Sequence, residues 1–172
     1  MQMLGRLIVG IVLLQAGCGD DDNGHGTGNG NIDAAVGATT FSSTLTTAAE
    51  VPVCAPASAS AAGAANVELA ADESSVIVEN VTFSGLSGPA TAAHIHTGAP
   101  GVAGPITIDF GADPTSPITM TVTAATYPSP PPAGAPPDFA AFIRELEAGN
   151  TYVNVHTAAC PPGEIRGQLQ QQ

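Results

Sequence analysis

From about residue 38 onward, the chain consists largely of short runs in which apolar and polar residues alternate. In an extended strand, successive side chains point to opposite faces, so this alternation places the apolar residues on one buried face. Gly, Pro, Ala and Asp, residues typical of turns and loops, separate the runs. About eight such runs predict an all-β Greek-key sandwich or barrel. The runs begin at Phe41, Asn66, Val76, Ala92, Ile106, Ile118, Tyr152 and Glu164.

One segment has helical rather than strand periodicity. Its apolar residues recur at the spacing i, i+3, i+4 and i+7, which lines one face of a helix. These residues are Phe139, Phe142, Ile143 and Leu146. Asp138 can cap the start of this helix and Gly149 can end it. We therefore expect one short helix that packs its apolar face against the sheets.

The charge balance narrows the classes of partner. The chain has 15 acidic residues and 3 basic ones, for a formal net charge of −12. The basic residues are Arg6, Arg144 and Arg166, and the chain contains no Lys. A surface of this charge repels a polyanion, so we expect no nucleic-acid partner.

The first residues have the features of an export signal. Arg6 precedes a short apolar stretch, Leu7–Leu14. This stretch is too short to span a bilayer as a mature helix, which favours a cleaved signal peptide over residues 1–17.

The end of this segment resembles the lipobox of bacterial lipoproteins, because the small residues Ala16 and Gly17 precede Cys18. We expect Cys18 to be acylated and residues 18–37, rich in Gly, Asp and Asn, to form a disordered tether. Residues 38–171 would then form a folded domain outside the cytoplasm, anchored by lipid in the bacterial cell envelope, at the outer membrane or the cell surface. An ordinary secretory signal with an incidental Cys18 is the alternative.

Two further cysteines remain if Cys18 carries lipid. An oxidising compartment favours a disulfide between Cys54 and Cys160. Cys54 comes after the first predicted strand and Cys160 before the last, and these strands are commonly neighbours in a closed sandwich. Two free thiols are the alternative.

Three histidines carry the most distinctive chemistry. His94 and His96 are two residues apart and therefore share one face of a strand, while His156 lies in a second strand. If the two strands meet, three imidazoles suit copper or zinc with one open coordination position. The alternative is a buried polar network in which the imidazoles bond to Glu164, Arg166 or backbone carbonyls. Glu164 and Arg166 are themselves predicted to belong to a structural polar network.

Three segments, in order, resemble the CHRD domain, a module that takes its name from chordin. The segments are residues 40–52, 82–106 and 148–169, and the resemblance runs from about residue 39 to 169. Their most specific pieces are Ala93–His96, Asn154–Thr157 and Gly163–Gln168. It implies an extracellular β-sandwich module and does not imply an enzyme. In general architecture such a sandwich is also similar to Ig domains and to Cu/Zn superoxide dismutase, which has a His-x-His strand and a nearby disulfide.

Signatures of common catalytic sites are missing from the sequence. It contains no nucleophile elbow, phosphate loop, His-Glu-x-x-His or Cys-x-x-Cys motif. The leading prediction is therefore a non-catalytic binding or display module for an unidentified extracellular or periplasmic ligand. Metal binding through the three histidines is the first alternative, and an extracellular enzyme of unrecognised type is the second.

Overall fold

The computed structural model describes residues 37–172. The expected signal peptide, Cys18 and all but the last residue of the expected tether lie outside this part of the chain. The strands are β1 (Thr39–Thr46), β2 (Ala62–Leu69), β3 (Ser75–Ser84), β4 (Ala90–Thr97), β5 (Ile106–Ala112), β6 (Ile118–Thr123), β7 (Thr151–Thr157), β8 (Ile165–Gln168) and β9 (Gln170–Gln171). A 3-10 turn, η1 (Thr47–Ala49), follows β1, and the helix α1 (Phe139–Glu147) precedes β7.

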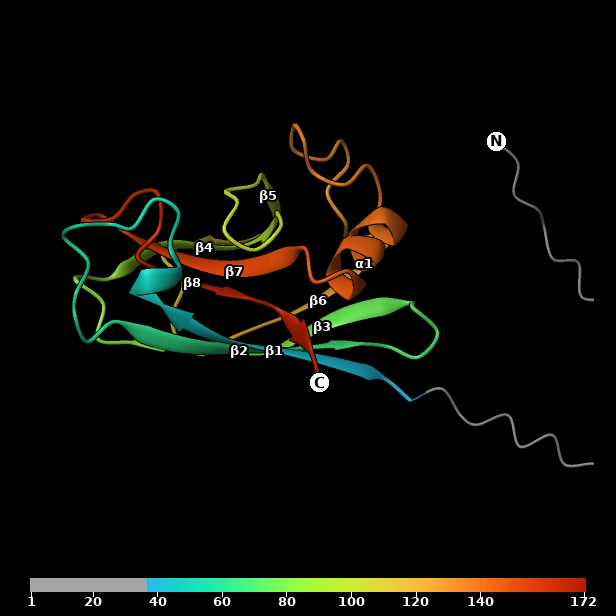
Figure 1. Cartoon of the computed structure of the whole chain (residues 1–172). Coiled ribbons are helices and arrows are strands. Elements are labelled where there is room, and N and C mark those ends of the chain that lie inside the picture. The colour runs from blue at the N-terminus through green and yellow to red at the C-terminus, as the bar shows by residue number, and fades with distance from the viewer. Residues whose placement is uncertain (1–36) are drawn as a thin grey trace, which may run out of the picture. The chain divides into compact units, whose positions relative to one another are not determined.

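The strands form one antiparallel sheet that curls into a nearly closed barrel. Their order is β5-β4-β7-β8-β1-β2-β3-β6, and β9 pairs with β1. The connection after β3 leads to β4 on the other side of the sheet, where β5 pairs with β4. The chain then returns to place β6 beside β3, and β7 afterwards pairs with β4. Figure 1 shows the result as two layers, with β4 and β7 above β1, β2 and β3. The predicted all-β fold is confirmed.

The interior of the barrel is filled largely by small and β-branched side chains. Val76 and Val78 on β3 face Val153 and Val155 on β7 across a core in which Phe41 is one of the largest members. Each of these residues alternates with a residue on the outer face, as the pleat of a strand requires.

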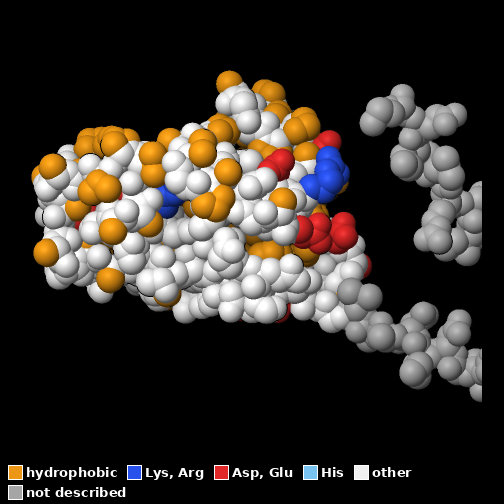
Figure 2. All heavy atoms as spheres, viewed as in Figure 1, with side chains coloured by type: hydrophobic (Ala, Val, Ile, Leu, Met, Phe, Trp, Pro, Cys, Tyr) orange, Lys and Arg blue, Asp and Glu red, His pale blue; other side chains and the backbone are white. Residues whose placement is uncertain are grey.

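The predicted helix is present as α1, with all four predicted apolar residues buried. Asp138 caps it, because its side chain accepts a hydrogen bond from the Ala141 N–H at 2.7 Å. Arg144 and Glu147 lie on the exposed side, and Figure 2 shows charged side chains gathered at the α1 end of that face. Among residues 37–172, no helix has the length and apolar character needed to cross a membrane.

Candidate metal centre

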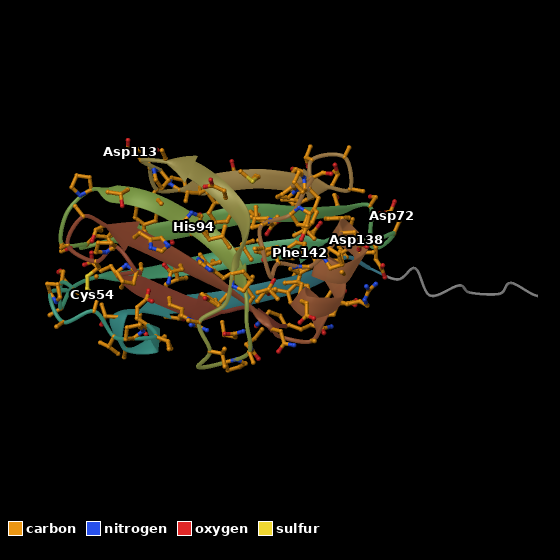
Figure 3. All side chains as sticks on the ribbon, turned by 90° about the horizontal axis from the view of Figure 1, so that it is seen from above. Cys54, Asp72, His94, Asp113, Asp138 and Phe142 are labelled. Atoms are coloured by element: carbon orange, nitrogen blue, oxygen red, sulfur yellow. A yellow bond between two sulfur atoms is a disulfide. The ribbon has the colours of Figure 1, made fainter. Side chains whose placement is uncertain are left out.

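The three histidines lie on the outer face of the barrel, where β4 and β7 pair. Ala93 and Ile95 of β4 point into the core, so His94 and His96 point outward. In the register of the two strands, His96 lies opposite Tyr152. Figure 3 shows His94 between Cys54 at one end of the barrel and Phe142 near α1 at the other.

The structure brings the three imidazoles together. His94 Nδ1 lies 3.0 Å from His156 Nε2. One nitrogen from each of the three rings lies within 4.8 Å of the others, and the side chains of His94, His96 and His156 are all buried. Loops therefore cover this outer face, which is why every residue of β7 is buried.

Backbone carbonyls fix the tautomers of two of these rings. His96 Nδ1 lies 3.0 Å from the Gly104 carbonyl, and His156 Nδ1 lies 2.8 Å from the Pro161 carbonyl. Because a carbonyl only accepts, each Nδ1 carries the proton and each Nε2 has a free lone pair. His96 Nε2 is buried and has no hydrogen-bond partner among the described residues.

The His94 ring has its two nitrogens the other way round, with Nδ1 toward the other imidazoles. His94 Nδ1 faces the other imidazoles, and its Nε2 lies 3.6 Å from the Asp109 carboxylate on β5. His156 Nε2 can only accept, so in the metal-free protein His94 Nδ1 donates to it. Each of the three rings thus has one nitrogen toward the centre and one toward an outer acceptor.

Burial also controls the charge of the cluster. It lowers the pKa of His94, His96 and His156, in the case of His96 to about 4. The proximity of His156 lowers the pKa of His94 further. At neutral pH the imidazoles are therefore uncharged, which is the form that binds metal ions.

The β4–β5 loop, residues 98–105, stands above β4 and β7 (Figure 1), and its Gly104 carbonyl bonds to His96. His96 stacks on the Tyr152 ring, with centroids 4.8 Å apart and planes 6° apart. The guanidinium carbon of Arg166 lies 3.4 Å from the centroid of the same ring, and its Nη2 donates to the Val102 carbonyl of the loop at 2.9 Å. Only glycine fits at Gly104, because a Cβ there would collide with the Thr97 carbonyl.

Glu164 and Arg166 do not bond to each other. Glu164 precedes β8 and is fully buried; it accepts hydrogen bonds from Ser58 N (2.9 Å), Ser87 N (2.8 Å), Ser87 Oγ (2.6 Å) and Thr157 Oγ1 (2.6 Å). Burial by itself would raise the pKa of Glu164, but these hydrogen bonds outweigh it and hold the pKa below its ordinary value. Glu164 therefore ties three loops together, while Arg166 supports the β4–β5 loop.

A second buried carboxylate was not predicted from the sequence. Glu50 is 5% exposed and accepts from Asn154 Nδ2 at 3.0 and 2.9 Å. Burial raises the pKa of Glu50 to about 7. Gly163 adopts a φ of 140°, and a Cβ there would collide with both Asn154 and Glu50. The spacing of Asn154 and Tyr152 in β7 predicts that both lie on the same face of that strand. Glu50 lies outside any periodic run, so no such pattern indicates its position.

The predicted disulfide is confirmed. Cys54 and Cys160 are joined, with their Cα atoms 5.9 Å apart. It links the β1–β2 loop to the β7–β8 loop, residues 158–164, at the same end of the barrel as the Glu164 hydrogen bonds.

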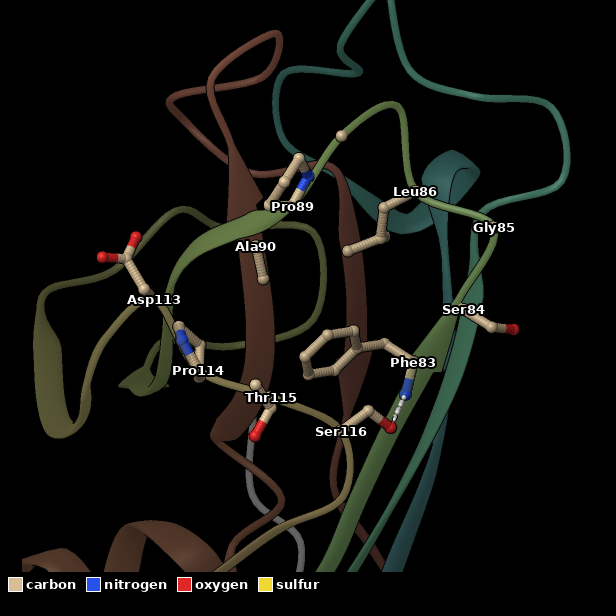
Figure 4. Close-up of a pocket in the computed structure, with 11 residues that line it drawn as sticks. Phe83, Ser84, Gly85, Leu86, Pro89, Ala90, Asp113, Pro114, Thr115 and Ser116 are labelled. Atoms are coloured by element: carbon tan, nitrogen blue, oxygen red, sulfur yellow. Dashed lines mark hydrogen bonds between the residues drawn. The ribbon is translucent and has the colours of Figure 1, made fainter.

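A separate apolar hollow lies at the end of the barrel between the β3–β4 and β5–β6 connections. Phe83, Leu86, Pro89 and Pro114 line it (Figure 4), and its volume is about 440 Å³. Asp113 is the one titratable residue in the lining. We call the cluster of His94, His96 and His156 the three-His site.

Comparison with known families matches residues 41–169 to the CHRD domain. No curated protein and no solved structure matches the chain. The match covers most of the chain and includes every strand from β2 to β8, together with all three histidines. The chain belongs to the CHRD domain family.

Proposed function

We propose that the domain is a metal-binding module that holds one copper or zinc ion through His94, His96 and His156. The observation that carries the proposal is the orientation of the three rings, each with one nitrogen toward a common centre and the other toward Gly104, Pro161 or Asp109. Metal-bound histidines have such outer acceptors in nearly every known site, because the acceptor fixes the tautomer and the ring orientation. Gly104 and Pro161 do this for His96 and His156, whereas His94 would change tautomer on binding, with its proton moving to Nε2 on the side of Asp109.

The distances fit a metal ion after a small adjustment. Two imidazole nitrogens bound to one tetrahedral zinc ion are about 3.3 Å apart. The His94–His156 separation of 3.0 Å is close to this value. The ring nitrogens of the group lie within 4.8 Å of one another, so the His96 ring completes the site with a shift of at most about 1.5 Å.

A buried hydrogen-bond network without metal is the competing interpretation. It accounts for His94 and His156, which bond to each other, but it leaves His96 Nε2 buried without a partner. A buried polar atom of this kind costs about 1–3 kcal/mol, which a bound cation removes. The unpartnered nitrogen therefore favours the metal over the network.

Three protein ligands leave one coordination position for water or another small ligand. The imidazoles and the metal would suffice for a binding and display role, which needs no nucleophile or general base. We therefore assign the domain a non-catalytic role in which the metal ion is the ligand.

Titration of the purified domain with Zn²⁺ and Cu²⁺ tests this function. We expect the wild type to bind one ion and His96→Ala to bind it more than about 100-fold more weakly, since loss of a ligand costs more than loss of an outer partner. Thr91→Ala, an exposed change on the outer side of the same strand, is the matched control and should bind as the wild type does. Negligible binding by the wild type, or equal binding by all three proteins, would show that the site holds no metal.

We further propose that the domain is exported and anchored by lipid at Cys18. The disulfide supports an oxidising, non-cytoplasmic compartment. Mass spectrometry of the mature protein should find an acylated N-terminal Cys18, and Cys18→Ser should move the protein from the detergent phase to the aqueous phase. An unmodified mature protein that begins at another residue would contradict the anchor.

A further inference from the structure

The loop that orients one metal-binding histidine is also the loop that carries the disulfide. Cys160 and Pro161 are consecutive in the β7–β8 loop. Cys160 is fully buried and bonded to Cys54, and the Pro161 carbonyl accepts the Nδ1 proton of His156 at 2.8 Å. The covalent link is thus one residue away from the atom that sets the tautomer of His156.

The other hydrogen bonds near the tip of this loop lie within the loop or run to Thr157, the last residue of β7. Cys160 N donates to the Thr157 carbonyl at 3.1 Å, and Gly163 N donates to the Cys160 carbonyl at 3.1 Å. The bonds to Thr157 hold Cys160 to the end of its own strand, β7, and none of them reaches another loop. At the far end of the loop, Glu164 accepts from Ser58 and Ser87, which belong to two other loops. Of the attachments to other loops, the disulfide is therefore the one closest in sequence to Pro161.

We propose that the Cys54–Cys160 disulfide sets the metal affinity of the three-His site by holding the Pro161 carbonyl against His156. The proposal rests on the metal-binding function proposed above. While the bond is intact, His156 is held with its proton on Nδ1 and its lone pair on Nε2 toward the centre. Without the bond, the loop tip is free to move and the ring can take either tautomer, so metal binding must also order the loop and the ring. The oxidised chain is then the form with the preorganised site.

The Cys54–Cys160 disulfide is reduced by ordinary thiol–disulfide exchange with a dithiol. Cys54 is half-buried whereas Cys160 is inaccessible, so the attacking thiolate reaches the Cys54 sulfur. The Cys54–Cys160 bond breaks, a mixed disulfide forms at Cys54, and the sulfur of Cys160 takes a proton. The second thiol of the reductant then releases Cys54. The protein gains two electrons and two protons, and the dithiol becomes a disulfide.

The test compares zinc affinity with and without the disulfide in the folded domain. Cys54→Ala/Cys160→Ala should bind Zn²⁺ about 10- to 100-fold more weakly than the oxidised wild type, the range found when outer partners of metal ligands are lost. Val76→Ala is the matched control, because it weakens the core on β3 and leaves both the disulfide and the histidines in place. It should bind zinc as the wild type does.

A second readout separates orientation of the ring from stability of the fold. Nitrogen chemical shifts of the metal-free proteins should show His156 protonated only at Nδ1 in the wild type and as a mixture of tautomers in the double variant. If the wild type binds zinc and the double variant binds it equally well, the coupling is absent while the metal site stands. If the oxidised wild type binds no zinc, the metal function itself fails.

Should the double variant not fold, the wild type alone can test the coupling. Coupling between two sites is reciprocal, so bound zinc must make the disulfide harder to reduce by the same factor. Reversible exchange with glutathione converts the protein disulfide and two thiols to two protein thiols and one glutathione disulfide. At half reduction, the ratio of the squared thiol concentration to the glutathione disulfide concentration should rise about 10- to 100-fold in the zinc-loaded protein, and an unchanged ratio would overturn the proposal.

Discussion

Replacing Glu164 with alanine is expected to lower the free energy of unfolding by about 4 kcal/mol, because buried donors left without acceptors cost about 1–3 kcal/mol each. The substitution removes the acceptor of four hydrogen bonds, two of them from the backbone N–H groups of Ser58 and Ser87. Urea unfolding of the two proteins at pH 7 measures the difference. The three-His site should respond as well, since Glu164 ends the loop that carries Pro161.

The pH dependence of this loss distinguishes the carboxylate from mere packing. The pKa of Glu164 is lower in the folded protein than its ordinary value. Its contribution is therefore fully present above the unfolded-state pKa and is lost as the pH falls through the lower folded-state value. Glu147→Ala, on the exposed side of α1, is the control and should change the free energy by less than about 0.5 kcal/mol. A loss below about 1 kcal/mol for Glu164→Ala would contradict the assigned role.

Replacing Glu50 with glutamine is expected to stabilise the metal-free domain at alkaline pH. Burial raises the pKa of Glu50 from 4.5 to about 7, so folding favours its protonated form. The wild type should therefore lose stability as the pH rises from about 4.5 through 7, by about 3 kcal/mol at 1.36 kcal/mol per pKa unit. Glutamine keeps an oxygen to accept from Asn154 and carries no charge, so it avoids this loss.

Unfolding measurements at pH 4.5 and pH 8 check the sign. Glu50→Gln and the wild type should be similar at the lower pH, and the variant should be the more stable at the higher pH. The low pKa values of the three imidazoles act in the opposite direction, because the folded protein loses stability when they are protonated below about pH 6.5. They are the same in both proteins, so the difference between the proteins isolates Glu50. A difference that does not vary with pH would refute the expected burial effect.

The strands and the positions of the three histidines could be predicted because both depend on a periodicity of two residues. His94 and His96 share a face for this reason, and the neighbouring β4 and β7 bring His156 to the same place. The confirmed disulfide required only that Cys54 and Cys160 lie near neighbouring strands. These features follow from the local geometry of a strand and from the pairing of a few neighbouring strands.

The atoms that orient the histidines could not be predicted in the same way. Two of them are backbone carbonyls, at Gly104 and Pro161, and a carbonyl is present at every residue. Glu50 lies between η1 and β2, where no periodic pattern indicates its direction. The donors to Glu164 come from loops whose paths depend on the closed barrel. Such contacts are determined by tertiary structure rather than by local sequence.

The alternation of β4 and β7 has a consequence for protein engineering. Ala93, Ile95, Val153 and Val155 build the core, while the histidines occupy only the positions between them. The ligand set is thus open to redesign without repacking the interior: exchange of His96 or His156 for a thiolate or thioether residue alters the hardness of the donor set and hence the ion it prefers. If the three-His site binds a metal as proposed, single substitutions in this chain should change the metal selectivity while the fold stays the same.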